Sequence, residues 1–401
     1  MTYICIFIII LLLIVNYTIY KMNYIHKNLF ITINILIILY SIISVSIYYN
    51  NIYLNYDNGI LFGNVLNNHF CDEYRYYKDS EILMNHLKSG NFYDWITGIL
   101  PDYEYIDPQG HPGFGNYNIF VIIISLLRIL GFNSVLELIL IKLFILLITI
   151  IFIYKLSNIF LTEKISLVVT IIYSLLPGYI LTNTLLMRDN IIILLCIICI
   201  YYILKKDYNL FILIPTLIAL FLLRAYLPPI LLISYIFCYK NTTKLISFKD
   251  IIYLAIIFLS VIFFSSVNFN YTIMRIMQEN FQVLFGSGLI APIKVFINTF
   301  IHIAIDPQLL NFLLSGQLYL ILYSLGNICS NILSILLIIK LIMLLFSNLN
   351  NKTLYLLKFT FYFSFITGIL VLSKDGYIIN RIALMWIPLF LIILFIPRKI
   401  K

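Results

Sequence analysis

Charged residues are scarce in this chain. Of its 401 residues only 11% are charged and 62% are hydrophobic, and the mean hydropathy is +1.02. A soluble domain of this length carries about a quarter charged residues, so this chain has too little charge to cover a surface that faces water. The scarcity excludes a soluble globular protein and predicts an all-α, polytopic protein of the lipid bilayer.

Cysteine motifs suited to redox or metal chemistry and basic patches are lacking as well. Cys196 and Cys199 form a CxxC motif, but it lies inside an apolar run where neither redox exchange nor a zinc site is expected. No cluster of basic residues interleaved with aromatics stands outside the apolar runs, which excludes nucleic acid as a partner. The net charge of +9 therefore bears on membrane topology.

Apolar runs long enough to cross roughly 30 Å of hydrocarbon recur along the chain. They predict about eleven transmembrane helices in a single integral membrane domain, residues 1–401. The runs fall at about 2–20, 29–49, 138–158, 165–183, 190–204, 208–223, 225–240, 251–267, 317–345, 354–373 and 382–397. Two further stretches, 116–131 and 289–305, are interpreted as helices that lie at the outer surface.

Lysine placement supports this interpretation, because short cytoplasmic loops retain positive charge. If both stretches lie outside, the loops on the cytoplasmic side contain most of the basic residues. These are Lys21, Lys27, Lys155, Lys164, Lys205, Lys206, Lys240, Lys244, Lys249, Lys352, Lys358, Arg398, Lys399 and Lys401. Only three acids, Glu163, Asp207 and Asp250, lie on the same side. If 116–131 alone crossed the membrane, most of these clusters would fall on opposite faces. The pattern predicts an outer N-terminus and a cytoplasmic C-terminus.

One long acidic connection lies on the predicted outer side. Residues 50–137 form this first outer loop, which includes the interfacial helix 116–131, and most of the chain's 17 acids lie in it. A second outer segment covers residues 268–316. Long loops in compact proteins are usually functional, so we expect the chemistry on this face.

Arginine is rare, and its placement is uneven. Of seven arginines, all but Arg398 fall at or near the predicted outer boundary. Charges beside hydrocarbon are costly and usually functional, and the planar guanidinium group suits phosphate. The candidate ligands for a lipid phosphate or diphosphate are Arg188, Arg224, Arg275 and Arg381. The alternative is that each arginine snorkels or pairs with a nearby acid.

Carboxylates accompany the arginines. Asp72 and Glu73 are adjacent in the first outer loop, and Asp189 follows Arg188 between two apolar runs. Such a carboxylate can act as general base on an acceptor hydroxyl or hold a metal. Ordinary alternatives are solvated loop acids and, for Asp189, a helix cap. His111 is a candidate acceptor contact or an ordinary loop histidine. A divalent metal stays open, and no other cofactor is expected.

Two segments carry a resemblance to a known class. SLLPGYILTNTLLMRDNIIILL at 174–195 resembles the second outer loop of GT-C glycosyltransferases, and HPGFGNYNIFVIIISLLRILGF at 111–132 is similar to their first-loop helix. The resemblance covers about residues 50–240. It implies a bacterial inner-membrane glycosyltransferase, with a polyprenyl-phosphate-linked sugar donor and a lipid-linked or glycan acceptor. It also implies Asp72 as catalytic carboxylate, Glu73 beside it and Asp189 as the second-loop acid.

This chain departs from the GT-C pattern in two ways. It has two apolar runs before the first acidic loop where the class usually has one, and its C-terminal half shows no motif of the class. The sequence is also similar in layout to the repeat-unit polymerases of O-antigen and capsule assembly, because LMRD at 186–189 is followed by LLRAYLPP at 222–229.

A lipid-linked sugar flippase or transporter is the alternative from another class. Such a protein should carry ionisable groups near mid-bilayer, on discontinuous helices in paired repeats. Here only Lys142 and Lys340 stand well inside the apolar runs, which favours surface chemistry.

Overall fold

The chain is helical throughout the part that the computed structural model describes. That part comprises residues 2–61, 72–97, 119–206, 209–224, 226–239, 247–266, 282, 286–294, 309–347, 349–371 and 383–397. No β-strand occurs in these ranges, which confirms the all-α prediction.

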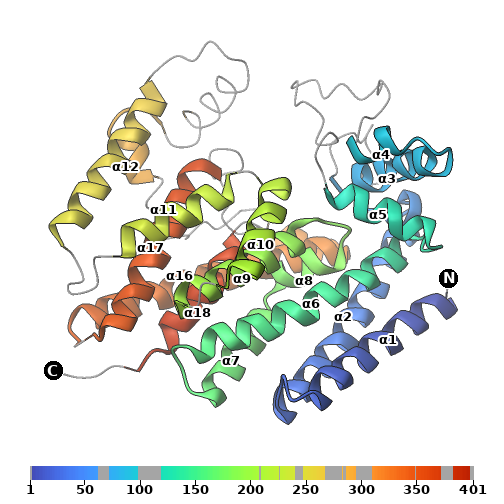
Figure 1. Ribbon diagram of the computed structural model, residues 1–401, viewed down its shortest axis with the longest axis horizontal. Coiled ribbons are helices and arrows are strands. Elements are labelled where there is room, and N and C mark those ends of the chain that lie inside the picture. Colours follow the sequence, from blue (N-terminus) through green and yellow to red (C-terminus); the bar gives the residue numbers. More distant parts are fainter. Residues whose placement is uncertain are drawn as a thin grey trace.

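Three long helices form one layer of the molecule. α1 (Thr2–Lys21), α2 (Lys27–Tyr53) and α6 (Val135–Asn158) contact one another and lie side by side (Figure 1). Asn16 of α1 donates a hydrogen bond to Asn34 of α2 at 2.7 Å. α6 begins with a capping box in which Ser134 and Glu137 exchange side-chain and backbone hydrogen bonds.

The helices differ in how well they suit a membrane crossing. Four described helices are long and apolar enough to span one by length and composition: α1, α2, α6 and α16 (Leu318–Leu345). A fifth span is formed if α7 (Glu163–Ser174) and α8 (Pro177–Thr184) are counted together across their bend of 62°. These helices support the prediction of a membrane protein.

The break between α7 and α8 has a local cause. α8 begins with Pro177 at its first position, where the missing N–H and the fixed φ angle favour the start of a new helix over the continuation of an old one. α7 therefore ends at Ser174 and the chain changes direction before α8.

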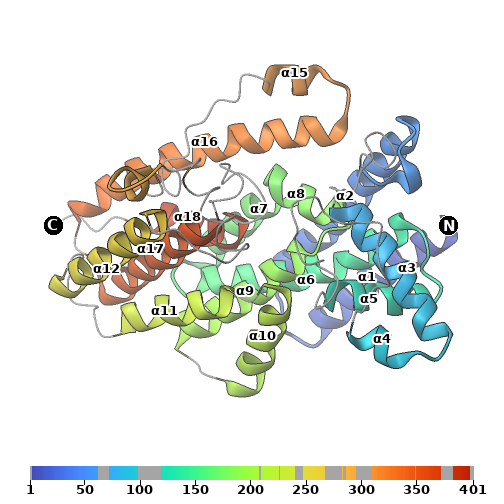
Figure 2. The ribbon, with the colours of Figure 1, turned by 90° about the horizontal axis from the view of Figure 1, so that it is seen from above.

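Shorter helices complete the bundle. Every predicted apolar run contains helix in the described chain, although the run at 165–183 is divided between α7 and α8. The runs not yet named contain α9 (Asp189–Lys205), α10 (Leu210–Leu223), α11 (Leu227–Tyr239), α12 (Phe248–Ser266), α17 (Asn351–Val371) and α18 (Ile387–Phe395), of which only α12 and α17 are longer than 17 residues. α18 follows a short 3-10 turn, η3 (Ala383–Met385), and α15 (Leu309–Leu314) precedes α16. In Figure 2, α16 lies along one side of the molecule and α10 along the other.

The first outer loop contains helices of its own. η1 (Asp57–Gly59), α3 (Asp72–Lys88), α4 (Phe92–Thr97) and α5 (Ile119–Ile129) lie at the same end of the molecule as the start of α1 (Figures 1 and 2). α5 falls within the predicted interfacial helix 116–131. Of the second such stretch, 289–305, only the first few residues are described.

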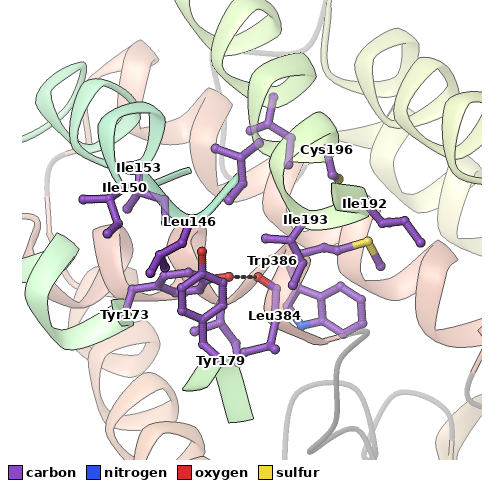
Figure 3. Packing of buried hydrophobic residues seen from close by; sticks show 14 of the residues in the cluster. Leu146, Ile150, Ile153, Tyr173, Tyr179, Ile192, Ile193, Cys196, Leu384 and Trp386 are labelled. Atoms are coloured by element: carbon purple, nitrogen blue, oxygen red, sulfur yellow. Dashed lines mark hydrogen bonds between the residues drawn. The ribbon is translucent and has the colours of Figure 1, made fainter. Parts of the chain in front are cut away.

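The core is continuous from α1 to α18. At its centre, Tyr173 of α7 donates a hydrogen bond to the carbonyl of Leu384 at 2.8 Å, and Figure 3 shows Trp386 beside Ile192 and Ile193 of α9. Trp386 is fully buried. These contacts fix the start of α18 against α7 and α9.

Two charges that the topology argument places in cytoplasmic loops are in fact buried. Asp250, in the first turn of α12, accepts a hydrogen bond from Lys358 of α17 at 2.6 Å, and both side chains are less than a tenth exposed. Tyr362 and Ser247 also donate to the Asp250 carboxylate. Because the buried pair contains one positive and one negative charge, removing it from the loop charges leaves the excess of positive charge on the predicted cytoplasmic side unchanged.

Candidate functional site

Glu73 joins three segments of the chain. It lies at the second position of α3 and is 1% exposed. Its two carboxylate oxygens accept backbone N–H groups from Leu186 at 2.6 Å and from Leu61 at 3.2 Å. The first outer loop and the connection between α8 and α9 therefore meet at one carboxylate, which we call the Glu73 staple.

The surroundings of Glu73 act on its protonation in opposite directions. Burial raises the pKa of the Glu73 carboxyl, whereas the N–H groups of Leu186 and Leu61 and the charge of Lys142 lower it; the net pKa is raised. With both oxygens already accepting hydrogen bonds, the geometry favours a role in positioning the loops over a role as proton acceptor.

Lys142 is the cation of this site. It lies two turns into α6 and is buried, and its ammonium group donates to the carbonyls of Thr182 and Leu185 at the end of α8. It interacts electrostatically with both Glu73 and Asp189. A lysine from the middle of the sequence thus links the first-loop and second-loop acids.

Asp189 and Arg224 form a buried ion pair. Asp189 begins α9 and is 3% exposed, and Arg224 ends α10. An Arg224 Nη atom lies 2.7 Å from an Asp189 carboxylate oxygen, and the other Nη donates to the Tyr226 hydroxyl at 2.7 Å. Asp189 lies in the first turn of α9, where its negative charge is favourable at the positive end of the helix dipole, and Arg188 occupies the capping position without a side-chain cap hydrogen bond. Arg224 nevertheless brings the connection between α10 and α11 to the same place.

Arg188 lies at the edge of this group. Its guanidinium carbon is 6.0 Å from the ring centroid of Tyr76, on the same helix as Glu73. The structure therefore gathers Glu73, Lys142, Arg188, Asp189 and Arg224 at one end of the bundle. We call these five residues the polar cluster.

The remaining predicted site residues fall at or beyond the limits of the described chain. The backbone of Asp72 begins α3, next to Glu73, and nothing is described of its side chain. His111, Arg275 and Arg381 lie outside the described residues, and their predicted roles stay predictions.

Arg128, another outer arginine, has a structural setting. It is buried in α5, donates to the Tyr77 carbonyl at 2.8 Å and to the Ser80 hydroxyl at 3.1 Å, and lies 4.4 Å above the Tyr77 ring. Sequence analysis left open whether each outer arginine binds phosphate or pairs with nearby protein groups. Arg128 pairs with nearby protein groups. It holds α3 on α5 and so supports the Glu73 staple.

Metal ligands do not gather in the described part of the chain. No group of three or more His, Cys, Asp or Glu side chains lies together there in a way that would hold a metal ion. Cys196 and Cys199 are buried free thiols on α9, in keeping with their interpretation as small apolar side chains.

Comparison with protein-family models, with curated proteins and with solved structures found no match. The chemistry of the polar cluster is therefore inferred from its own residues.

Lys142 was not predicted as a member of the site. The sequence marks it as an ionisable group inside an apolar run, which is the signal for a functional residue in a membrane segment, but gives no indication of its partners. Its partners, the carbonyls of Thr182 and Leu185, could not be found from sequence, because they lie at the end of α8, after a bend of 62° that the apolar run does not show.

Proposed function

We propose that this protein is a membrane glycosyltransferase that acts at the outer face of the bacterial cytoplasmic membrane. It transfers a sugar or oligosaccharide from a polyprenyl-phosphate or polyprenyl-diphosphate donor during assembly of a cell-surface polysaccharide. The observation that supports this most is the polar cluster itself. Its acids and cations come from α3, α6, α9 and the end of α10 and meet beside the amphipathic helices of the first outer loop.

The proposed chemistry divides the cluster by charge. Arg188 and Arg224, with Arg275 and Arg381, neutralise the phosphate leaving group as its negative charge develops, which is where positioned cations contribute most. Asp72 removes the proton of the acceptor hydroxyl. Glu73 holds the loop that carries Asp72, and Asp189 orients Arg224.

The proposal includes a topology. We propose about eleven crossings, with the N-terminus outside and the C-terminus in the cytoplasm, because short loops rich in lysine stay inside. Supporting this arrangement, α3, α4 and α5 lie at the end of the bundle where α1 begins (Figure 2). The prenyl chain then lies between helices and the head group reaches the polar cluster from the outer leaflet.

Substitution of the proposed base tests the function. We expect Asp72→Asn to abolish elongation of the surface glycan in the strain that carries the gene. Asp79→Asn, on the same helix, is the matched control and should leave the glycan at normal length. Normal glycan in both Asp72→Asn and Arg381→Gln would exclude the enzymatic proposal.

A second candidate is the repeat-unit polymerase of O-antigen or capsule assembly. The contact between Asp189 and Arg224 favours it, because it brings the segments that carry Arg188 and Arg224 to one place, as the layout of that family implies. A deletion strain with single-repeat glycans would support the polymerase, whereas loss of one defined sugar would support the single transferase.

A lipid-linked sugar flippase is the candidate from another class. The bent pair α7–α8 and the buried Lys142 against its carbonyls are features that transporters also use. Transbilayer movement of a fluorescent polyprenyl-diphosphate sugar in proteoliposomes, with no glycan product, would support this class.

A further inference from the structure

Four lysines gather at the far end of α6 from the first outer loop. Lys155 lies in the last turn of α6, Lys205 ends α9, Lys206 follows it, and Lys352 lies in the first turn of α17. Lys155 stands roughly 20 Å along α6 from Lys142 of the polar cluster, at about 1.5 Å per residue. The four lysines are therefore separate from the polar cluster, and we call them the lysine ring.

Two members of the lysine ring meet where α6 packs on α9. The Phe152 and Tyr201 rings lie edge to face with their centroids 5.7 Å apart. The Lys155 ammonium lies 5.6 Å from the Phe152 ring centroid, and the Lys205 ammonium lies 5.6 Å from that of Tyr201. The two lysines interact electrostatically, so like charges are held near each other here.

α17 completes the lysine ring. The Lys206 ammonium lies 5.2 Å from the ring centroid of Tyr355 on α17. The Lys352 ammonium lies 5.6 Å from the ring centroid of Phe160, just after the end of α6. Lys352 and Tyr355 are neighbours at i and i+3 on α17. The contacts therefore run from α6 to α9, from α9 to α17, and from α17 back to the end of α6.

Lys206 occupies a backbone conformation that lysine rarely adopts. It is the C-cap of α9, with φ +60° and ψ +30°, in the left-handed region. Glycine or asparagine usually takes such a position after a helix. The other non-glycine residues with positive φ in the described chain are all asparagines. Local structure therefore disfavours a lysine here, which indicates that its side chain has a role.

The dipole of α17 disfavours Lys352. The positive end of a helix favours acids and opposes cations, and the first turn of α17 contains Lys352 and no acid. Lys155 and Lys205 differ, because they lie in the last turns of their helices, where the dipole favours cations. Helix dipoles thus account for Lys155 and Lys205 but not for Lys352.

The lysine ring has an excess of positive charge. In the part of the chain that the structure describes, no carboxylate forms an ion pair with Lys155, Lys206 or Lys352. Two acids, Glu163 and Asp207, stand near the ring in sequence, so its four cations outnumber them. An aromatic face attracts an ammonium group on one side and leaves N–H donors on the other. The ring can therefore donate to an anion.

Membrane geometry selects the kind of anion. α6 has 24 residues and is about 36 Å long, so its last turn reaches the head groups of a bilayer with about 30 Å of hydrocarbon. Acidic phospholipids bring phosphate to this depth, and basic groups between helices bind such head groups. We propose that the lysine ring binds the phosphate of an anionic phospholipid. The lipid phosphate bridges α17 to α6 and α9, and this inference is independent of the proposed glycosyltransferase activity.

Native mass spectrometry of the purified, delipidated protein tests the inference. The probes are dioleoyl phosphatidylglycerol and dioleoyl phosphatidylcholine, titrated into wild type, Lys206→Gly and Lys352→Gln. We expect wild type to bind phosphatidylglycerol about tenfold more tightly than phosphatidylcholine. Each substitution should weaken phosphatidylglycerol binding about fivefold, the factor that corresponds to about 1 kcal/mol per lysine, and leave phosphatidylcholine binding unchanged.

Thermal unfolding without added lipid separates loss of binding from loss of fold. Lys206→Gly should unfold at the wild-type temperature or higher, because glycine accepts a positive φ. Lys352→Gln should unfold close to the wild-type temperature, because its lost contact with Phe160 is offset by removal of a cation from the positive end of α17. Lys21→Gln is the matched control. Lys21 also lies over an aromatic ring, 5.5 Å from the Tyr17 centroid, but in the last turn of α1 and outside the lysine ring.

The pattern across variants decides the outcome. Loss of phosphatidylglycerol affinity in Lys206→Gly and Lys352→Gln, with Lys21→Gln unchanged, supports the lipid site. Unchanged affinity in both ring variants overturns it, and so does an equal loss in Lys21→Gln, since that would show a general attraction to acidic lipid. Inorganic phosphate is titrated in the same way. If it bound wild type as tightly as phosphatidylglycerol and lost affinity in the same variants, the ring would hold a soluble anion and the lipid site would be wrong.

Discussion

The buried pair of Asp250 and Lys358 offers a measurement of how strongly α12 is joined to α17. Lys358→Met removes the cation and leaves the carboxylate with donors from Tyr362 at 3.0 Å and from the Ser247 N–H and hydroxyl at 2.7 and 2.6 Å. Breaking a buried ion pair costs about 3–5 kcal/mol. Because the three remaining donors still stabilise the carboxylate, we expect Lys358→Met to lower the free energy of unfolding by about 3 kcal/mol.

Asp250→Leu should cost more than the lysine substitution. It leaves a buried ammonium group with no counter-ion from this pair and also removes the acceptor of two hydroxyl groups and of the Ser247 N–H, so we expect about 5 kcal/mol. The double variant Asp250→Leu/Lys358→Met removes both charges together. Its remaining cost is the three donors left without an acceptor, about 1 kcal/mol each. The pair should therefore show a coupling free energy of several kcal/mol.

Steric-trap unfolding in bicelles measures these free energies without complete denaturation. Lys352→Met on the same helix is the control, since Lys352 is exposed and lies 5.6 Å from the Phe160 ring; we expect a change of about 0.5 kcal/mol. If the double variant were destabilised by the sum of the single variants, the ion pair would be absent in the bilayer and the reasoning refuted.

Three further substitutions test other parts of the fold. Because burial raises the pKa of Glu73, the folded state holds its proton more tightly than the unfolded state does. The free energy of unfolding should therefore fall as pH rises from 4.5 through the raised pKa. Glu73→Gln should remove this dependence of the unfolding free energy on pH. Arg128→Lys should speed hydrogen exchange in α3, because one ammonium group cannot both stack on Tyr77 and make the two hydrogen bonds of the guanidinium; an unchanged rate would contradict the structural role. Gly59→Ala should cost about 2–4 kcal/mol in thermal or steric-trap unfolding, because φ is +69° and the new Cβ would lie 2.5 Å from the Tyr48 ring.

The apolar runs predicted where the helices lie better than where they bend or end. Helices form in these runs because a backbone surrounded by apolar groups must satisfy its hydrogen bonds within the segment, but α10, α11 and α18 are shorter than a full crossing needs. The run at 165–183 reads as one span, yet Pro177 divides it into α7 and α8. A proline in an apolar run marks such a site, but the direction of the second half depends on packing against α16, α2 and α6.

The polar cluster was predicted in part. Asp189 begins one apolar run and Arg224 ends the next one. Two consecutive membrane helices place these two ends on the same face, so the residues can meet, and they form an ion pair at 2.7 Å. The acceptor geometry of Glu73 could not be predicted, because its partners are backbone N–H groups, which every residue but proline possesses and which leave no mark in the sequence.

Asp250 and Lys358 show the limit of counting charges in loops. Both were assigned to cytoplasmic connections because they stand near the ends of apolar runs, and both are buried against each other. A contact between residues 108 positions apart depends on how α12 and α17 pack, which local pattern does not contain.

The Glu73 staple constrains the order in which the protein assembles. Its carboxylate completes its hydrogen bonds only with the N–H of Leu186, a residue 113 positions later in the chain. The residues up to Leu186, including α6, α7 and α8, must therefore be synthesised before Glu73 can complete these hydrogen bonds. A nascent chain halted before residue 186 should leave α3 more open to protease than a chain released after α9.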